Sequence, residues 1–569
     1  MNRSPQRRRR DASPSKSQRG AGSQHGGPGR AGPGAPHEPD RRRLWTFVAL
    51  GVIVLVSVLR SLHLGFPLER DEGEFGYIAQ QILHGVPVYD SAYTQKLPGT
   101  YLLYALFLAL FGQTPAGIHL GLLLTDALTM ALVFLTLRRT HGGPAGCIGA
   151  FVFGIMALSP TVWGFAAHAT AFVALFATAG LFVLVHARES DRAVLFFGSG
   201  ICFGLAFLMK QPGIFFAPFA LALLAIDHVR TKPRRLARFA ARSLVLAAGA
   251  AIPFLLTTAY YAAIGDLSRF WFWTVQLAGQ FTGQVGLAPG LQNLRYRTAY
   301  VMNGFEILWI LALTGFVFEL LDRTSGKERY LYPTFALASV LSVVPGLFFT
   351  NHYYVSMLPA IALLVGALCG GLVRGGRPAG SRFAIAAGAW GLTGAGLILG
   401  ITRHEEYYLG QVADTVACRQ IYDGNPFPES MPIGQYLRNH TTAGDRIAML
   451  GSETQILFYS ERRSASRFIN TYFLTAHHPR NRAMQWEMIT DIERTRPKYI
   501  VFARFPMSWA LLTSSPRDIL NWFSTYGPSH YQLEGILQIN EGGSVLKWGD
   551  EARAEAPAEM NVEILRRLD

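Results

Sequence analysis

The stretch LWTFVALGVIVLVSVLRSL, from Leu44 to Leu62, contains one charged residue, Arg60, near its far end. A run of about 20 apolar residues is long enough to cross the hydrocarbon core of a bilayer as a helix. Three arginines precede it and no small-x-small cleavage site clearly follows it, so we interpret it as an uncleaved anchor. Because cytoplasmic segments carry the excess of Lys and Arg, these arginines predict a cytoplasmic N-terminus.

Ten further apolar runs extend this pattern along the chain. The protein has 569 residues, of which 50% are hydrophobic and 16% are charged, whereas soluble domains carry about 25% charged residues. By length and periodicity, the runs predict about eleven transmembrane helices in all, and therefore an all-α polytopic membrane domain. The ten lie at 117–137, 145–163, 167–187, 193–209, 212–229, 240–263, 299–321, 331–349, 353–373 and 383–402.

The net charge of +15 has two interpretations, a nucleic-acid-binding surface or the positive-inside bias of a membrane protein. The second fits better, because the basic residues gather at the ends of the apolar runs. With the connections numbered alternately from the cytoplasm, every inner one is basic and most outer ones are poor in Lys and Arg. An odd number of spans then predicts that the C-terminus lies outside, and no nucleic-acid partner is expected.

Composition divides the chain into three parts. Residues 1–43 are rich in Arg, Gly, Pro and Ser and contain almost no large apolar residues, which is typical of a disordered cytoplasmic tail. Residues 44–402 form the predicted transmembrane domain, with a long first outer loop at 65–115. In residues 403–569 the charges become dense and no spanning run remains.

This last part is predicted to be a small extracytoplasmic α/β domain, because short strand and helix patterns alternate in it. Two more strands are expected near its end, separated by the hairpin signal Glu541-Gly542-Gly543. The four cysteines of the chain form no C-x-x-C pair, so neither a disulfide framework nor a zinc pattern is indicated. The other expected elements are strands at Arg446–Leu450 and Tyr499–Ala503 and helices at Met484–Thr495 and Asp518–Tyr526.

The first outer loop is far too long for a plain connector. It contains Arg70-Asp71-Glu72-Gly73-Glu74, a helical stretch from Phe75 to Leu83, and the turn Gln95-Lys96-Leu97-Pro98-Gly99. A second apolar stretch, Thr100 to Phe111, is short for a span and suits a helix that lies in the membrane interface.

Two charged residues of this loop have a purely structural interpretation. Asp71 with Glu74 three residues later resembles a capping box at the start of a helix, where a carboxylate is favourable in any case. Lys96 has the character of a side chain that snorkels at the membrane surface. Taken alone, neither residue indicates chemistry.

Lys210 is harder to explain in structural terms. It lies on the predicted outer side and is the only charged residue between Arg192 and Asp227. A cation at this depth costs free energy and opposes the positive-inside tendency. Such residues usually face a cavity and pair with an anion, yet no acidic residue is near in sequence. We expect a distant carboxylate or a ligand phosphate to be the partner.

Other polar residues suit substrate binding and a structural role equally. His352 and Tyr353 lie at an outer turn, where tyrosines also meet lipid headgroups. The loop 264–298 holds tryptophans and amides, including Trp271, which suit a sugar-binding face or an interfacial belt. Asp126 lies within a predicted span and is either a functional residue or a polar contact between helices.

The sequence lacks the common nucleotide and hydrolase motifs. It has no Walker A loop, no G-x-G-x-x-G after a strand, no H-E-x-x-H and no G-x-S-x-G. It also has no D-x-D of the kind that holds a metal-bound sugar nucleotide. If the protein is an enzyme, its activated donor is therefore not expected to be a nucleotide. No cofactor and no metal are predicted, although the pattern leaves a divalent metal open.

Three separated segments resemble one family, the GT-C glycosyltransferases. The first is similar to the first outer loop of these enzymes, and the others resemble two further family segments. The similarity is greatest to the glycosyltransferase-39-like set, which includes protein O-mannosyltransferases, aminoarabinose transferases of lipid A and galacturonosyltransferase-like bacterial proteins. The segments are Asp71–Ala79 with Lys96–Tyr101 and Leu110–Gly112; Gly204–Gly213; and His352–Tyr354 with Leu358-Pro359.

The resemblance covers about residues 44 to 400, and residues 403–569 are similar only in outline to the outer domains of many members. One departure lies in the first outer loop. Many relatives have His-Lys-Pro-Pro where this chain has Gln95-Lys96-Leu97-Pro98, so the lysine and the second proline remain and the histidine is lost.

The resemblance implies a transferase whose donor is a polyprenyl-phosphate sugar. The acceptor hydroxyl, on a lipid, a glycan or a protein, would attack the anomeric carbon on the outer side of the cytoplasmic membrane, with inversion. Asp71 would accept the proton as general base, Glu72 would support Asp71 or the acceptor, and Lys96 and Lys210 would bind the phosphate. The remaining candidates, for substrate binding, are Gln211, His352, Tyr353 and Trp271.

Two other classes compete with this hypothesis. A transporter or flippase for a lipid-linked or anionic substrate would also be polytopic, but transporters often show repeated halves, and no internal repeat is visible in this sequence. A non-catalytic membrane scaffold would leave the cost of Lys210 unexplained.

Overall fold

The computed structural model describes residues 38–569 except 232, 282, 324–325, 327, 374–379, 541–542 and 569. The predicted disordered tail, residues 1–43, therefore lies almost wholly outside the described residues, and so does most of the hairpin signal Glu541-Gly542-Gly543. Two compact units are distinguished, Met1–Leu44 and Trp45–Asp569. The second unit holds the helical bundle, the sheet and every candidate site residue.

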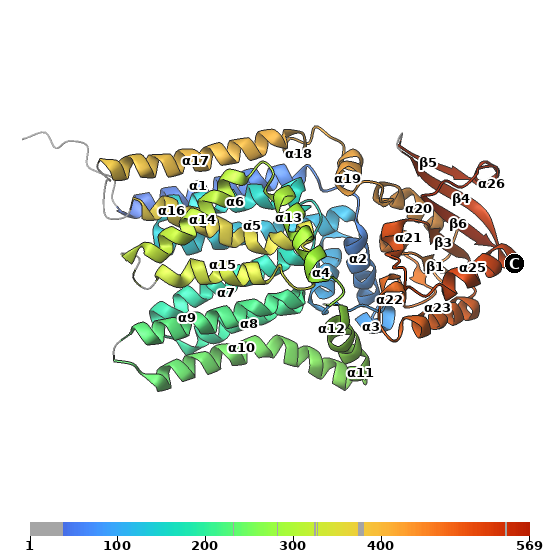
Figure 1. Ribbon diagram of the computed structural model, residues 1–569, viewed down its shortest axis with the longest axis horizontal. Helices are drawn as coiled ribbons and strands as arrows, with labels where there is room; N and C mark the ends of the chain where they lie inside the picture. Colours follow the sequence, from blue (N-terminus) through green and yellow to red (C-terminus); the bar gives the residue numbers. More distant parts are fainter. Residues whose placement is uncertain are drawn as a thin grey trace, which may run out of the picture. The chain divides into compact units, whose positions relative to one another are not determined.

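A bundle of long apolar helices fills the first part of this unit (Figure 1). Among the described residues, seven helices are long and apolar enough to cross a membrane, or eight if the bent pair α13 and α14 counts as one span. This is the bundle of a multi-pass membrane protein, while the predicted number of about eleven spans stays a prediction. The seven are α1 (Glu38–Ser61), α5 (Pro115–His141), α7 (Ala169–Ser190), α9 (Phe216–Arg230, with the turn before it), α10 (Leu236–Ala263), α16 (Leu358–Gly371, with the turn before it) and α17 (Ser381–Arg403).

The predicted span at 299–321 is broken. It divides between α13 (Leu287–Met302) and α14 (Glu306–Leu321), whose axes meet at 107°. Gly304 lies in the break with φ +85°, a conformation that glycine adopts without strain. The segment before it is also helical, so much of the predicted loop 264–298 is a series of short helices rather than an irregular connection.

Two other predicted spans contain shorter helices than expected, in each case ahead of a proline. The run at 145–163 supplies α6 (Gly143–Ala157), which ends before Pro160. The run at 331–349 supplies α15 (Leu331–Leu341), which ends before Pro345. Proline lacks the backbone N–H that continues a helix, and it disfavours helical geometry in the residue before it.

A second short apolar helix, α4 (Gly99–Phe111), forms where the sequence predicts one. Its Leu102, Leu106 and Leu110 recur every four residues and are exposed, so one face of α4 is apolar and uncovered by the chain. An exposed apolar stripe of this kind is what a helix in the membrane interface requires. Its location in the interface stays a prediction.

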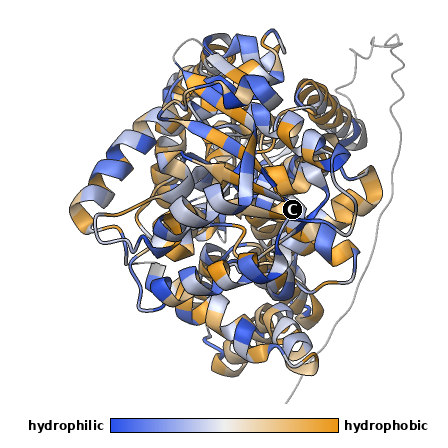
Figure 2. Ribbon diagram, turned by 90° about the vertical axis from the view of Figure 1, so that its right-hand side faces the viewer, coloured by the Kyte–Doolittle hydropathy of each residue, from blue (hydrophilic) through white to orange (hydrophobic). Residues whose placement is uncertain are grey.

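The C-terminal part is built on a six-stranded sheet of order β2-β1-β3-β6-β4-β5. β1 pairs in parallel with β2 and β3, and the other pairs are antiparallel. Viewed from the end that carries the sheet, hydrophilic residues are spread over the ribbon of this domain (Figure 2). The strands are β1 (Arg446–Leu450), β2 (Arg463–Ser464), β3 (Tyr499–Ala503), β4 (Tyr531–Asn540), β5 (Gly543–Trp548) and β6 (Asn561–Arg567).

A small α/β domain after the helical bundle is therefore confirmed. β1 and β3 have the predicted bounds, and the two predicted helices are α23 (Asn481–Thr495) and α25 (Asp518–His530). The sequence did not predict β6 or the helix α20 (Phe427–Asn439). β6 joins the two halves of the sheet, because it lies between β3 and β4.

The helix α2 (Arg70–Leu83) connects the bundle to this domain (Figure 1). It packs against α21 (Thr454–Ser460), the helix that follows β1. A Cβ on Gly73 would lie 2.2 Å from the backbone nitrogen of Gln455, and one on Gly76 would meet an aromatic ring of α21 at 2.8 Å. The two glycines therefore allow the helices to touch, which no side chain at Gly73 would permit.

Asp126 forms a polar contact between helices, the second of its two interpretations. Its carboxylate pairs with Arg60 at 2.5 Å, and both side chains are buried. Arg60 also donates hydrogen bonds to the carbonyls of Gly164 at 2.8 Å and Ala157 at 3.1 Å. The two terminal nitrogens of this buried arginine have three acceptors between them, while Nε has none among the described residues, so Arg60 fixes the loop that leads from α6 to His168.

Candidate active site

The helix α2 begins with a capping box that does not involve the side chain of Asp71. Glu69 is the N-cap residue, and its carboxylate accepts the backbone N–H of Glu72 at 2.9 Å. The Glu72 carboxylate in turn accepts the backbone N–H of Glu69 at 3.4 Å. The interpretation of Asp71 and Glu74 as the capping box is therefore wrong, because the box involves Glu69 and Glu72 instead.

Asp71 is paired with Lys96. The ammonium of Lys96 lies 2.9 Å from Oδ1 of Asp71 and 3.0 Å from Oε2 of Glu74, and it sits 4.5 Å from the centre of the Phe75 ring. Lys96 is thus held by three partners from α2 and does not extend freely to a membrane surface. Asp71, Glu74 and Phe75 are spaced three and four residues apart in the sequence, which puts them on one face of the helix.

Glu74 is itself held in place, which fixes Lys96 further. Its Oε1 accepts the hydroxyl of Tyr101 at 2.5 Å and the hydroxyl of Thr94 at 2.9 Å. Tyr101 lies in α4 and Thr94 in the turn before Lys96, so three segments of the first outer loop meet at one buried carboxylate. We interpret Glu74 as a positioning residue for the lysine.

The turn that carries Lys96 interlocks with the turn that carries Lys210. The hydroxyl of Thr100 donates to the carbonyl of Met209 at 2.9 Å, and the amide of Gln211 donates to the carbonyl of Gln95 at 2.7 Å. These bonds bring together two segments that are more than 100 positions apart. Gln211, a candidate for substrate binding, thereby acts as a structural link at this place.

The ammonium of Lys210 lies 3.7 Å from the centre of the Tyr353 ring, a cation–π contact. No carboxylate within ion-pair distance of this ammonium is found among the described residues. Next to Tyr353, the ring of His352 stacks on that of His168, with ring centres 3.9 Å apart. Asp71, His168 and His352 have ligand atoms within 4.8 Å of one another. The cluster thus joins Asp71, the two lysines, Tyr353 and both histidines.

The charges of the cluster shift one another. Burial alone would raise the pKa of Asp71, but the adjacent Lys96 outweighs burial and lowers the pKa to about 2. Burial lowers the pKa of Lys210 to about 7, and the distant charge of Asp71 offsets only part of this effect. Burial also lowers the pKa of Lys96, but Asp71 and Glu74 outweigh it and raise the pKa above its usual value. Lys210 is therefore the cation that needs a further anion.

Glu72 is not a member of the cluster and contacts the loop that precedes His168. Its side chain is fully buried, and Oε1 accepts the backbone N–H of Ala167 at 2.6 Å and faces Nε2 of His119 at 3.1 Å. Ala167 directly precedes His168, so Glu72 holds the loop that presents this histidine. The geometry gives Glu72 a positioning role, whereas the resemblance implied that it supports Asp71 or the acceptor.

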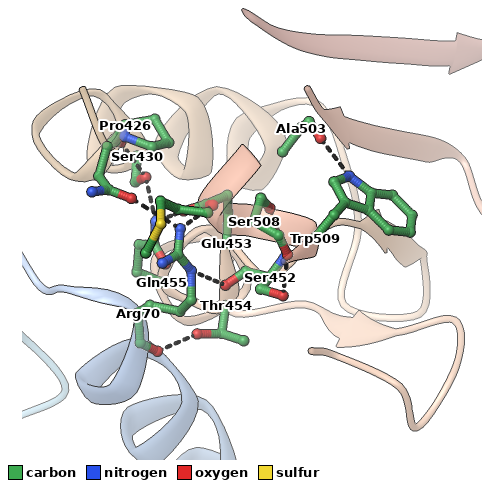
Figure 3. Close-up of polar contacts among 12 residues, drawn as sticks. Arg70, Pro426, Ser430, Ser452, Glu453, Thr454, Gln455, Ala503, Ser508 and Trp509 are labelled. Atoms are coloured by element: carbon green, nitrogen blue, oxygen red, sulfur yellow. Dashed lines mark hydrogen bonds and ion pairs between the residues drawn. The ribbon is translucent and has the colours of Figure 1, made fainter. Parts of the chain in front are cut away.

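Arg70 anchors the start of α2 to the C-terminal domain (Figure 3). Its guanidinium donates to the buried carboxylate of Glu453 at 2.6 Å and to the carbonyl of Ser452 at 3.1 Å. The hydroxyl of Thr454 donates to the carbonyl of Arg70 at 2.6 Å. Because Arg70 and Asp71 are adjacent, the end of β1 fixes the helix turn that presents the carboxylate.

Trp271, the last candidate for substrate binding, lies in α11 (Leu267–Trp271) and is 42% exposed. Its neighbour Trp273 is buried instead and stacks on Tyr93, with ring centres 4.6 Å apart. Tyr93 precedes the Lys96 turn, so Trp273 is the tryptophan that contacts the first outer loop.

Comparisons with known proteins find partial matches in sequence. A model of the family described as dolichyl-phosphate-mannose-protein mannosyltransferase matches residues 95–260. The undecaprenyl phosphate-alpha-4-amino-4-deoxy-L-arabinose arabinosyl transferase 2 of Pseudomonas fluorescens is 27% identical over 240 residues, or 40% of this chain. This match spans 39% of the relative's own length.

Two solved structures share the fold. ArnT from Cupriavidus metallidurans, bound to undecaprenyl phosphate, superposes with a TM-score of 0.55 at 12% identity, over 93% of this chain and 98% of ArnT. The chain has the fold of ArnT, which is of the GT-C type. The archaeal oligosaccharyltransferase AglB from Archaeoglobus fulgidus superposes on this GT-C chain with a TM-score of 0.50 at 13% identity, over 92% of this chain and 76% of AglB.

Of the GT-C cluster, sequence reasoning found Asp71, Lys96, Lys210, His352 and Tyr353. It missed His168, although a signal was present: apart from Cys147, His168 is the only ionisable side chain between His141 and His186. An isolated ionisable residue in an apolar stretch is a functional candidate by default. It also missed the anchoring role of Arg70, for which the local sequence contains no signal.

Proposed function

We propose that this GT-C chain transfers a sugar from a polyprenyl-phosphate donor to an acceptor hydroxyl of a lipid, a glycan or a protein. The observation that carries the proposal is the convergence of one carboxylate and two ammoniums, Asp71, Lys96 and Lys210, at the end of an apolar helical bundle. A carboxylate suits proton transfer from a hydroxyl, and paired cations suit a phosphate. Their place at the bundle end lets a membrane lipid reach them.

The proposed step is a single displacement. The acceptor oxygen bonds to the anomeric carbon while the bond between that carbon and the phosphate oxygen breaks, so the configuration inverts. The proton of the hydroxyl passes to Asp71, and the electron pair of the broken bond stays on the polyprenyl phosphate. Lys96 and Lys210 stabilise the charge that develops on the leaving phosphate, and the sugar passes through an oxocarbenium-like state.

The pairing of Asp71 with Lys96 suggests how donor binding prepares the base. A carboxylate with a pKa of about 2 is a weak base, and the Lys96 ammonium is the main cause of the lowering. A donor phosphate would compete for the same ammonium and draw it from Asp71. The pKa of Asp71 would then rise towards its ordinary value, so the base becomes stronger when the donor is in place.

The printed names of the comparison proteins support the donor class. The Pseudomonas fluorescens relative is named for an undecaprenyl phosphate sugar, the matching family for dolichyl-phosphate-mannose, and both solved neighbours hold a polyprenyl phosphate. The positive-inside pattern supports an extracytoplasmic site in the cell membrane, with the C-terminal domain on the same side.

A transfer assay tests the proposal. Membranes that contain the protein receive polyprenyl-phosphate sugars labelled in the sugar, and the label is followed from the lipid donor to an acceptor fraction. We expect transfer with the wild type and strong loss in Lys96→Gln, with Arg482→Gln, a surface arginine, as the matched control. If no donor of this class is consumed, the proposal is wrong and a transporter becomes the better hypothesis.

The lowered pKa of Lys210 predicts how kcat/KM for the donor depends on pH. Its ammonium has a pKa of about 7 and must be charged to bind the donor phosphate, so kcat/KM for the donor should fall as pH rises above about 7. In Lys210→Arg the side chain stays charged, and this decline should disappear. Measurement of kcat/KM between pH 6 and about 9 decides the matter, because identical profiles for both proteins would exclude Lys210 as the titrating group.

A further inference from the structure

One end of the C-terminal sheet gathers positive charge. The strands β1, β2 and β3 begin at this end, and the antiparallel strand β6 finishes there. The four chain segments that meet at this end contain eight basic residues and two acidic ones. Both acidic residues are in ion pairs, Asp445 with Lys498 and Glu461 with Arg438. The segments are 445–446, 461–463, 494–498 and 566–567.

Four of the basic residues form a row across neighbouring strands, which we call the basic row. Arg463 of β2 is the register partner of Arg446 of β1. Lys498, directly before β3, donates its backbone N–H to the carbonyl of Arg446 at 3.2 Å. The carbonyl of Lys498 in turn accepts the backbone N–H of Arg567 of β6 at 3.0 Å. Because neighbouring strands lie about 4.8 Å apart, the basic row is about 14 Å long.

The stability of the sheet does not explain this row. Like charges directly opposite one another on neighbouring strands are destabilising, and Arg446 faces Arg463 in this way. Within the described residues, no carboxylate lies within ion-pair distance of either arginine. The guanidinium of Arg446 donates instead to the backbone carbonyl of Ser464 at 3.0 Å. Two adjacent arginines without a counter-charge therefore point to an anion from outside the chain.

The chemistry and length of the row define this anion. Arginine presents a planar fork of donors that fits carboxylate and phosphate groups. A length of about 14 Å exceeds one such group and suits a chain with repeated negative charges. Single-stranded nucleic acid is a poorer fit, because its bases stack on accessible aromatic side chains. Tyr499 and Tyr531, which accompany the row on β3 and β4, are both buried.

We propose that the basic row, Arg463, Arg446, Lys498 and Arg567, binds an acidic glycan, a sugar chain with repeated carboxylate or phosphate groups. The negative groups of the glycan would lie between the like charges of the row and offset their repulsion. The surface is separate from the donor site, whose residues come from the helical bundle and the first outer loop. The matching family model covers residues 95–260 and so ends before this domain.

The basic row is also connected to the helix that carries Asp71. The backbone N–H of Ser464, the neighbour of Arg463, donates to the buried hydroxyl of Tyr77 at 2.9 Å. Tyr77 follows Asp71 by six positions in α2, which is about 9 Å along the helix axis. A bound glycan of several sugars can therefore extend towards Asp71. Its role as the acceptor rests on the proposed function, whereas its binding to the row does not.

The test measures binding by the full-length protein in detergent, with no donor present. The probes are a fluorescent oligogalacturonate, a hexose oligomer joined by phosphodiesters, and a neutral dextran oligomer of the same length. We expect the wild type to bind at least one acidic oligomer about 10-fold or more tightly than dextran. The double variant Arg446→Gln with Arg463→Gln should bind that oligomer about 10-fold or more weakly than the wild type. The acidic oligomer that binds more tightly identifies the anionic group.

Two controls separate this surface from general effects. Arg482→Gln should bind as the wild type does, because Arg482 lies in the first turn of α23, at the opposite end of that helix from residues 494–498. Thermal unfolding then shows whether the variants are folded. Arg463→Gln should unfold at or above the wild-type temperature, since it removes one of two like charges that face each other.

Three results would overturn the proposal. The wild type binds the acidic oligomers no more tightly than dextran, the folded double variant keeps the wild-type affinity, or single-stranded DNA of equal charge binds more tightly than either oligomer. The last result would make the surface a nucleic-acid site. A protein that binds the acidic glycan but consumes no polyprenyl-phosphate sugar would refute the proposed function and leave the glycan site in place.

Discussion

Replacing Asp71 by Asn should lower kcat for sugar transfer by about 10²- to 10⁴-fold, the usual contribution of a general base. The substitution keeps the size of the side chain and removes its capacity to accept a proton. It also removes one of the two carboxylates that hold the Lys96 ammonium, so Lys96 keeps only Glu74 at 3.0 Å and becomes more available for the donor phosphate. We therefore expect KM for the donor to fall while kcat collapses.

This combination is diagnostic, because a misfolded variant would lose donor binding as well. The measurement is the transfer of label from a polyprenyl-phosphate sugar at several donor concentrations, together with the binding of unlabelled polyprenyl phosphate. Asp90→Asn is the matched control, since Asp90 is a carboxylate of the same outer loop that pairs with Arg269 at the surface. Transfer by Asp71→Asn within about threefold of the wild type would exclude the base assignment.

Breaking the ion pair of Arg70 and Glu453 should have the largest effect on the contact between the bundle and the C-terminal domain. The Glu453 side chain is fully buried, and removal of one partner of a buried ion pair costs about 3–5 kcal/mol. Arg70→Met leaves the carboxylate without its cation, so we expect a lower unfolding temperature. We also expect a lower kcat, because Asp71 is presented by the same turn of α2.

A double replacement distinguishes the pair from a general defect. In Arg70→Met with Glu453→Leu no buried charge is left alone, so part of the lost stability should return. The surface pair of Arg482 and Asp518 in the same domain supplies the control, and Arg482→Ala should leave the unfolding temperature unchanged. If Arg70→Met unfolds at the wild-type temperature with wild-type kcat, the anchor has no role.

The sequence predicted most of the cluster because its members are chemically conspicuous. Lys210 is a lone charge in an apolar region, and Asp71 with Lys96 stands in a loop too long to be a connector. Lys210 was expected from its own cost, whereas Asp71 and Lys96 were given a role only by the resemblance to the GT-C family. The fold class followed in the same way, since apolar runs and dense charge separate the bundle from the α/β domain.

The partners of these residues were beyond prediction because they are distant in the chain. Glu453 lies 383 positions after Arg70, and the carbonyl that Gln211 reaches belongs to Gln95. The capping box was assigned to Asp71 and Glu74 because glutamate is an unusual N-cap residue, so the role of Glu69 was overlooked. The predicted lengths of the spans differ from the observed helices where Gly304 or a proline interrupts an apolar run, because hydropathy does not indicate where a helix backbone breaks.

The separation of Arg70 and Glu453 along the chain also determines when each of them is synthesised. At about 5–20 residues per second, two residues 383 positions apart leave the ribosome about 20–80 s apart. Throughout that interval α2 lacks the helix against which Gly73 and Gly76 pack, and Arg70 lacks its anion. The first outer loop is thus among the last parts to mature, and a nascent chain carries its bundle before α2 has its partner helix.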